Sequence, residues 1–216
     1  MNKECHKGIR EAGEDDSVQV IIVTEAGGSF CSGTDLSHLD QQSSEDQVKE
    51  TDAMKRSEVV WPILHNPKPI IAAIDGYAVG MGAEFTSQCD IRIASTNYRL
   101  SWAFTKRGLV PDSGAGSWLL PKLIGLQKFL ELLFTGRFVE ADEVLEMGYL
   151  LKVVEPENLM EEARILAQMM LQGSPYAQAK TKKLVYEGLS VEAGDHVKRS
   201  AKALSECFVS EDHQEG

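Results

Sequence analysis

The sequence predicts an α/β fold in its first half and a mainly helical region after it. Short apolar stretches alternate with turns and helices up to about residue 121, a pattern typical of α/β layer folds. From Lys122 onward the apolar residues recur mostly at helical spacing. The chain has 216 residues, of which 43% are hydrophobic and 25% charged. We therefore expect one globular domain over residues 1–216.

Strands and helices alternate in the first half. Residues from Asn2 to Ala12 have the apolar spacing of an amphipathic helix, and Val18 to Val23 is an apolar run that predicts a buried strand. Ile70 to Ile74 and Ile91 to Ala94 predict two further strands, with a helix from Gly82 to Gln88 between them. This order favours a sheet with helices packed on it.

A polar segment interrupts this order. Residues 41–50 are polar and acidic, and a helix leading toward Pro67 is then marked by Met54, Val59, Val60, Ile63 and Leu64. A mobile lid over a pocket and a solvated linker both have this composition, so the sequence leaves the two open.

The second half predicts helices with one short strand among them. The expected helices are Gln127 to Phe134, Glu140 to Met147, Glu157 to Leu171, Tyr176 to Tyr186 and Val191 to Val209, and the strand is Leu150 to Val154.

Charge and cysteine content exclude several classes of protein. The chain carries 22 basic and 33 acidic residues, a formal charge of -11, which disfavours nucleic acid or an anionic membrane as a partner. The four cysteines are far apart and form no CxxC pair, so neither a zinc site nor a disulfide framework is indicated. Neither a signal peptide nor an apolar stretch of membrane-spanning length is visible. We expect a cytoplasmic protein without a metal.

Two glycine-rich turns carry the strongest functional signal. Gly28 to Leu36 follows the apolar run Val18 to Thr24, and Gly80 to Glu84 follows Pro69 to Ile74. Glycine lets a ligand oxygen approach backbone N–H groups, and a helix N-terminus favours negative charge. The pattern predicts two amide donors that hold one oxygen, with a carboxylate beside them. Taken alone, each turn is also explained as a tight connection between a strand and a helix.

Together with a third motif, these turns resemble the enoyl-CoA hydratase/isomerase, or crotonase, superfamily. The matching segments are Phe30 to Leu36, Lys68 to Asp90, Gly108 to Gly125, Phe134 to Gly136 and Gly148 to Leu150, in the family's order. The resemblance implies a ββα spiral core over about residues 1–172 and C-terminal oligomerisation helices over about 173–216. Family members begin earlier and end later, which implies a chain shortened at both ends.

The resemblance also implies a site. In the family, two backbone N–H groups hold the carbonyl oxygen of an acyl-CoA thioester, and the matching amides here belong to Ser32 and Met81. Position matching assigns CoA or substrate contacts to Phe30, Cys31, Gly33, Thr34, Asp35, Leu36, Gly80, Gly82 and Phe104. From the residues alone, Phe30 is equally well a core residue.

Two acidic residues match catalytic positions of the family. Glu84 stands where hydratases carry one of two glutamates, but Phe104 replaces the other. Asp112 matches the proton-transferring acid of the family's isomerases, including dienoyl-CoA and epoxyphenylacetyl-CoA isomerases. Each has a structural alternative: Glu84 as a solvated first-turn residue, and Asp112 as a helix N-cap. An apolar pocket around either carboxylate raises its pKa and suits it to proton transfer.

We therefore expect an acyl-CoA enzyme of fatty-acid or aromatic-acid degradation type that isomerises an enoyl double bond through an enolate. The alternatives are an enoyl-CoA hydratase and a non-catalytic acyl-CoA-binding domain. CoA enters as part of the substrate, so no separate cofactor is expected. The resemblance further implies a homotrimer or hexamer.

Overall fold

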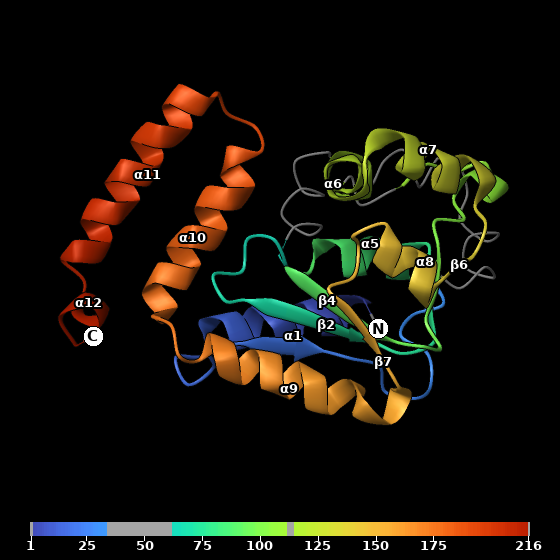
Figure 1. Cartoon of the computed structure of the whole chain (residues 1–216), viewed down its shortest axis with the longest axis horizontal. Coiled ribbons are helices and arrows are strands. Elements are labelled where there is room, and N and C mark those ends of the chain that lie inside the picture. Colours follow the sequence, from blue (N-terminus) through green and yellow to red (C-terminus); the bar gives the residue numbers. More distant parts are fainter. Residues whose placement is uncertain (1, 34–61, 112–114, 216) are drawn as a thin grey trace.

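In the computed structural model, which describes residues 2–33, 62–111 and 115–215, a four-stranded parallel sheet lies at the centre (Figure 1). The strand order is β1-β2-β4-β7. The strands span Ile21–Val23 (β1), Ile70–Ile74 (β2), Ile91–Ser95 (β4) and Lys152–Val154 (β7). Parallel pairing sets Ile21 opposite Ile70 and Ile71 opposite Ile91. A parallel sheet of this kind needs cover on both faces.

The side chains of β2 alternate between the two faces of the sheet, and each face is covered by other parts of the chain. Ile71 and Ala73 face helix α9 (Leu159–Met170), which lies along one side of the sheet (Figure 1). Ile70 and Ile74 point the other way, into the larger core. All five residues of β2 are buried, so the strand reads as a continuous apolar run rather than an alternating one.

A second, smaller sheet continues the winding of the chain. It has the order β3-β5-β6, and its strands span Tyr77–Val79, Arg99–Ser101 and Val139–Glu140. The chain passes from β2 through β3 into helix α5 (Met81–Gln88), and then from β4 through β5 toward helix α6 (Ala115–Ile124). This repeated ββα unit confirms the predicted α/β class. Strands β3, β5 and β6 were not predicted: each has only two or three residues, and none lies in a longer apolar run like those that contain β1 and β7.

The other helices include five that follow the predicted order and three short ones, at Thr105–Arg107, Pro156–Asn158 and Glu211–Glu215, that were not predicted. They are α1 (Asn2–Glu14), η1 (Thr105–Arg107), α7 (Leu126–Thr135), α8 (Ala141–Glu146), η2 (Pro156–Asn158), α10 (Pro175–Gly188), α11 (Ala193–Phe208) and α12 (Glu211–Glu215). Most boundaries differ from the predicted ones by one or two residues, and the largest difference is that strand pairing begins at Ile21 rather than at Val18. The polar segment 41–50, with the predicted helix from Met54 up to residue 61, lies outside the described residues, and the end of that predicted helix at residues 62–65 forms turns instead.

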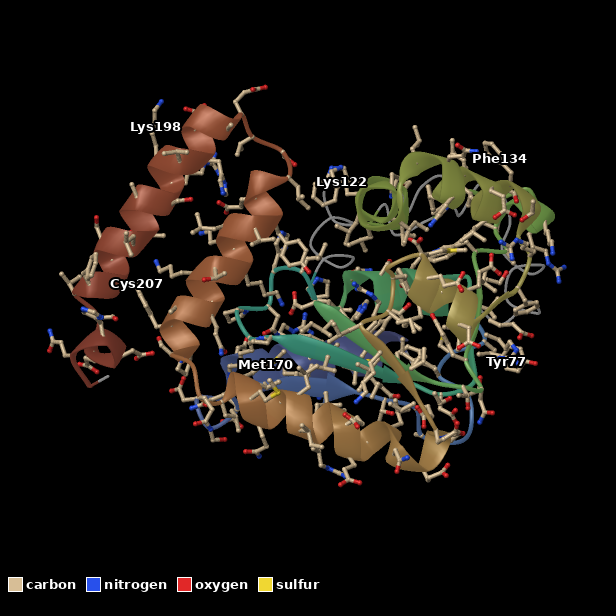
Figure 2. All side chains as sticks on the ribbon, viewed as in Figure 1. Tyr77, Lys122, Phe134, Met170, Lys198 and Cys207 are labelled. Atoms are coloured by element: carbon tan, nitrogen blue, oxygen red, sulfur yellow. The ribbon has the colours of Figure 1, made fainter. Side chains whose placement is uncertain are left out.

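Helices α10 and α11 project from the body as a pair (Figure 1), and Figure 2 shows Lys198 and Cys207 on the outer helix. A largely buried ion pair fixes α10 to the core: Lys182 Nζ lies 2.7 Å from Asp90 Oδ2. Tyr186 donates to the other oxygen of Asp90 at 2.9 Å, and Lys182 also donates to the carbonyl of Lys68 at 3.0 Å. Burial lowers the pKa of Lys182. The C-terminal helices are therefore anchored at the turn between α5 and β4.

Within the described ranges, every helix is too short or too polar to cross a lipid bilayer.

Candidate functional site

Helix α5 begins at a glycine whose backbone conformation other residues rarely adopt. Gly80 has φ 53° and ψ -112°, in the positive-φ region that favours glycine. Its N–H donates to the carbonyl of Ser101 at 2.9 Å, which fixes the turn to strand β5. Met81 is consequently the first helical residue, and the amides of the first turn have no acceptor within the helix.

The loop after β1 lies directly beside this helix start. Cys31 N–H donates to the carbonyl of Tyr77 at 2.8 Å, and Val79 N–H donates to the carbonyl of Cys31 at 2.9 Å. Cys31 thereby forms a parallel bridge with Ala78. Ser32 follows the bridge immediately, so its amide lies next to the turn that opens α5.

Two glycines allow this close approach. A Cβ on Gly82 would stand 2.4 Å from the carbonyl oxygen of Cys31, well inside the closest distance that real side chains tolerate. Gly33, at φ +97°, would place a Cβ 3.0 Å from the carbonyl oxygen of Val79. The two loops therefore touch backbone to backbone, and these two glycines make room for the neighbouring loop.

The amides of Ser32 and Met81 remain available to a ligand. Among the residues that the structure describes, neither N–H has a hydrogen-bond acceptor. Ser32 is exposed and Met81 is half-buried, so both lie within reach of solvent. Amide donors on adjoining loops, one of them at a helix N-terminus, suit an oxygen that carries partial negative charge.

Glu84 lies in the first turn of α5 with its side chain fully buried. Its Oε2 accepts a hydrogen bond from the N–H of Gly116 at 3.1 Å. Because Gly116 is in the first turn of α6, the carboxylate lies at the N-terminus of that helix, where negative charge is stabilised. Glu84 is thus held between two helices, and it is not the solvated surface residue of the structural alternative.

Gly116 is a site residue whose role the sequence analysis did not assign. A Cβ at this position would lie 1.6 Å from Oε1 of Glu84, so only glycine leaves room for the carboxylate. Gly116 belongs to the glycine-rich motif that the sequence shows before Leu119. That the missing side chain of Gly116 leaves room for the Glu84 carboxylate follows only from the packing of α5 on α6.

Two aromatic residues expected at the CoA or substrate site lie in the hydrophobic core. Phe30 and Phe104 are each 9% exposed and belong to the main cluster. Phe104 also starts the η1 turn, where its carbonyl accepts from the N–H of Arg107 at 2.9 Å. The four other expected site residues, Thr34, Asp35, Leu36 and Asp112, lie outside the described residues.

In the described part of the chain, His, Cys, Asp and Glu side chains do not gather in groups of three that could hold a metal ion. All four cysteines are free thiols.

Comparison with known proteins agrees with the resemblance. The sequence model described as enoyl-CoA hydratase/isomerase matches residues 1–216. The chain is 33% identical to the short-chain-enoyl-CoA hydratase of Clostridium acetobutylicum, over 99% of this chain and 81% of that protein. It is 31% identical to the 1,2-epoxyphenylacetyl-CoA isomerase of Escherichia coli, over 78% of this chain and 64% of that protein. The crystal structure of enoyl-CoA hydratase from Bacillus anthracis, 30% identical, matches with a TM-score of 0.91 and covers 100% of this chain and 83% of that chain. The predicted crotonase-like fold is confirmed.

We predict that Gly116→Ala lowers the free energy of unfolding by about 1 to 3 kcal/mol, because the added methyl group forces the Glu84 carboxylate or α6 to move. Thermal and urea unfolding measure the change. Gly194→Ala on α11 is the matched control: a Cβ there meets open space, and alanine favours the helix by about 0.4 to 1 kcal/mol. Equal effects of the two substitutions would contradict the packing described for Glu84.

Proposed function

Because the chain belongs to the enoyl-CoA hydratase/isomerase family, we propose that it acts on an acyl-CoA thioester and moves a carbon–carbon double bond along the acyl chain. The observation that carries the proposal is the pair of amides at Ser32 and Met81, on touching loops and without acceptors among the described residues. CoA takes part as the thiol portion of the substrate, and no further cofactor enters the proposed reaction.

In the proposed reaction, the two amides donate to the thioester carbonyl oxygen. Removal of a proton from the acyl chain sends its electron pair toward that oxygen and gives an enolate, whose charge both N–H groups stabilise. Each such donor contributes roughly 3 to 4 kcal/mol to lowering the barrier. Return of a proton to a different carbon gives the isomer, so the acyl chain gains and loses no atoms.

We assign the proton transfers to Glu84 and Asp112. The buried Glu84 carboxylate lies on the same helix as the Met81 amide, three residues further along, and the Gly116 N–H holds one of its oxygens. That hydrogen bond favours the ionised form, so Glu84 suits the role of base. Asp112 comes shortly before α6 in the sequence, and we propose that it exchanges the proton at the other carbon.

Hydration of the double bond is the second candidate, because relatives such as those of Clostridium acetobutylicum and Syntrophomonas wolfei are named hydratases. Addition of water in the family uses two glutamates to orient and deprotonate one water molecule. Phe104 occupies the place of the second glutamate and lies in the core. This difference favours isomerisation.

We further propose that the chain forms a homotrimer or hexamer in the cytoplasm. Helix α11 supports the assembly, because Val197, Leu204 and Phe208 on it are 66%, 57% and 58% exposed. Their spacing of seven and four residues places them on one face of the helix. The four free thiols are compatible with a reducing compartment.

Met81→Pro tests the amide donor directly. Proline removes the N–H but is favoured at the first helical position, and the Gly80 backbone at ψ -112° is outside the α region that a following proline excludes. We expect kcat to fall by roughly 10²- to 10³-fold. Met81→Ala keeps the N–H and is the control, expected within about threefold of wild type. Equal kcat for the two variants would remove Met81 from the proposed site.

Substrate comparison separates the two candidate reactions. We expect the wild type to convert a 3-enoyl-CoA to its 2-enoyl isomer faster than it hydrates crotonyl-CoA, with both followed by absorbance of the conjugated thioester. Glu84→Gln and Asp112→Asn should each lower isomerisation by about 10²-fold or more, because each removes a proton carrier. Rapid hydration that is lost in Glu84→Gln but kept in Asp112→Asn would instead identify a hydratase.

Leu204→Glu tests the assembly. A carboxylate within the exposed apolar face of α11 cannot be buried between copies without a large cost, so we expect smaller particles by light scattering. Lys198→Glu, on the same helix with an 80% exposed side chain, is the control. A wild-type chain that stays monomeric at micromolar concentration would contradict the proposed oligomer.

A further inference from the structure

Arg92 is a buried cation at the opposite end of the helix that carries Met81 and Glu84. It is 7% exposed and lies on strand β4. Its Nη1 donates to the carbonyls of Cys89, the C-cap of α5, at 2.6 Å and of Thr86, in the last turn of α5, at 3.3 Å. Its Nε donates to the carbonyl of Tyr149 at 2.8 Å.

The charge of Arg92 is balanced by carbonyl dipoles rather than by an anion. Over the described residues, no carboxylate forms an ion pair with its guanidinium. The guanidinium carbon lies 4.7 Å from the centre of the Tyr149 ring. Burying a charge in this way is costly unless hydrogen bonds compensate it. Arg92 therefore occupies the negative pole of α5 and cancels much of it.

Tyr149 links Arg92 to α5: its carbonyl accepts from Arg92 Nε at 2.8 Å, and its hydroxyl lies 2.8 Å from Thr86 Oγ1. The Tyr149 phenol experiences both charges: burial raises its pKa, the Arg92 guanidinium lowers it, and Glu84 raises it. Helix α5 has eight residues, so its two ends are about 12 Å apart. Over this distance the positive charge of Arg92 attracts negative charge at the Met81 amide by direct Coulomb interaction.

We infer that Arg92 is a positioning residue of the proposed active site, which holds the C-terminal end of α5 and makes its N-terminal end more favourable for the enolate oxygen. The inference rests on the proposed acyl-CoA reaction. At an effective dielectric constant of about 20, a unit charge 12 Å away changes the rate roughly tenfold. Since the substrate carbonyl carries less charge than the enolate, the effect falls on kcat rather than on KM.

Two substitutions separate the charge from the hydrogen bonds. Arg92→Gln keeps N–H donors but removes the charge, whereas Arg92→Lys keeps the charge but loses the forked donor geometry. We expect Arg92→Gln to lose roughly tenfold in kcat with KM nearly unchanged, and Arg92→Lys to stay within about threefold. Both should unfold at lower temperature than wild type. Rates are normalised to the folded fraction measured by circular dichroism.

Arg99 provides the matched control. Its Nη1 also donates to two backbone carbonyls, those of Tyr98 at 2.8 Å and Thr96 at 3.3 Å, but it lies on β5 and pairs with Glu140. We expect Arg99→Gln and Arg99→Lys to have equal kcat. A difference between them as large as that between the Arg92 variants would overturn the inference.

Gln88→Glu decides the question where the Arg92 variants do not fold. Gln88 is the last residue of α5 and is 3% exposed, and glutamate has nearly its shape. A buried glutamate at this end ionises only as the pH rises, and we expect kcat of Gln88→Glu relative to wild type to fall roughly tenfold with that ionisation, followed by the infrared band of the carboxylate. A ratio that stays constant while the carboxylate ionises would overturn the inference. Wild-type turnover is measured first: its absence contradicts the proposed reaction, whereas normal kcat in Arg92→Gln contradicts only the role of Arg92.

Discussion

The contact between the Cys31 carbonyl and Gly82 is the constraint on which the proposed site depends. These residues come from loops that are far apart in the sequence, and a single methyl group at Gly82 would separate them, because it would lie 2.4 Å from that oxygen. Parallel pairing of β1 with β2 brings the two loops to the same edge of the sheet. The bridge between Cys31 and Ala78 then fixes the loop that carries Ser32 against the segment that leads to Met81. Any displacement of one loop moves one donor relative to the other.

Local patterns in the sequence were sufficient for most of the fold. The apolar run Ile70–Ile74 is a fully buried strand, as predicted, and the amphipathic periods after Lys122 correspond to helices α7 to α11. Strands β3, β5 and β6 were missed because none lies in a longer apolar run, and the extent of so short a strand is set only by its partner. The boundary at Val18 was wrong for the same reason, since pairing with β2 starts at Ile21.

In the candidate site, too, some residues could be predicted from the local sequence and others could not. The glycine-rich turns and Glu84 were identified from local composition, because close backbone approach requires glycine wherever it occurs. Gly116 and Arg92 were not identified from the sequence. Gly116 matters only because α6 packs on α5, and Arg92 looks like an ordinary polar residue within an apolar strand. Their structural roles depend on contacts between elements that are distant in the sequence. Neither hydrophobic periodicity nor amino-acid composition predicts such contacts.

Buried charges around α5 are balanced mainly by helix ends. The carboxylate of Glu84 lies at the N-terminus of α6, and the guanidinium of Arg92 lies at the C-terminus of α5. Lys182 and Asp90, by contrast, form a direct ion pair away from the proposed site. Dipoles of fixed backbone groups stabilise a charge that lies out of reach of water, and the Gly116 N–H gives this support to the fully buried Glu84 carboxylate. The proposed isomerisation rests on one contrast: position 104 carries an apolar ring and supplies no carboxylate to orient a water molecule with the proposed base Glu84, whereas removal of a proton from carbon needs no bound water.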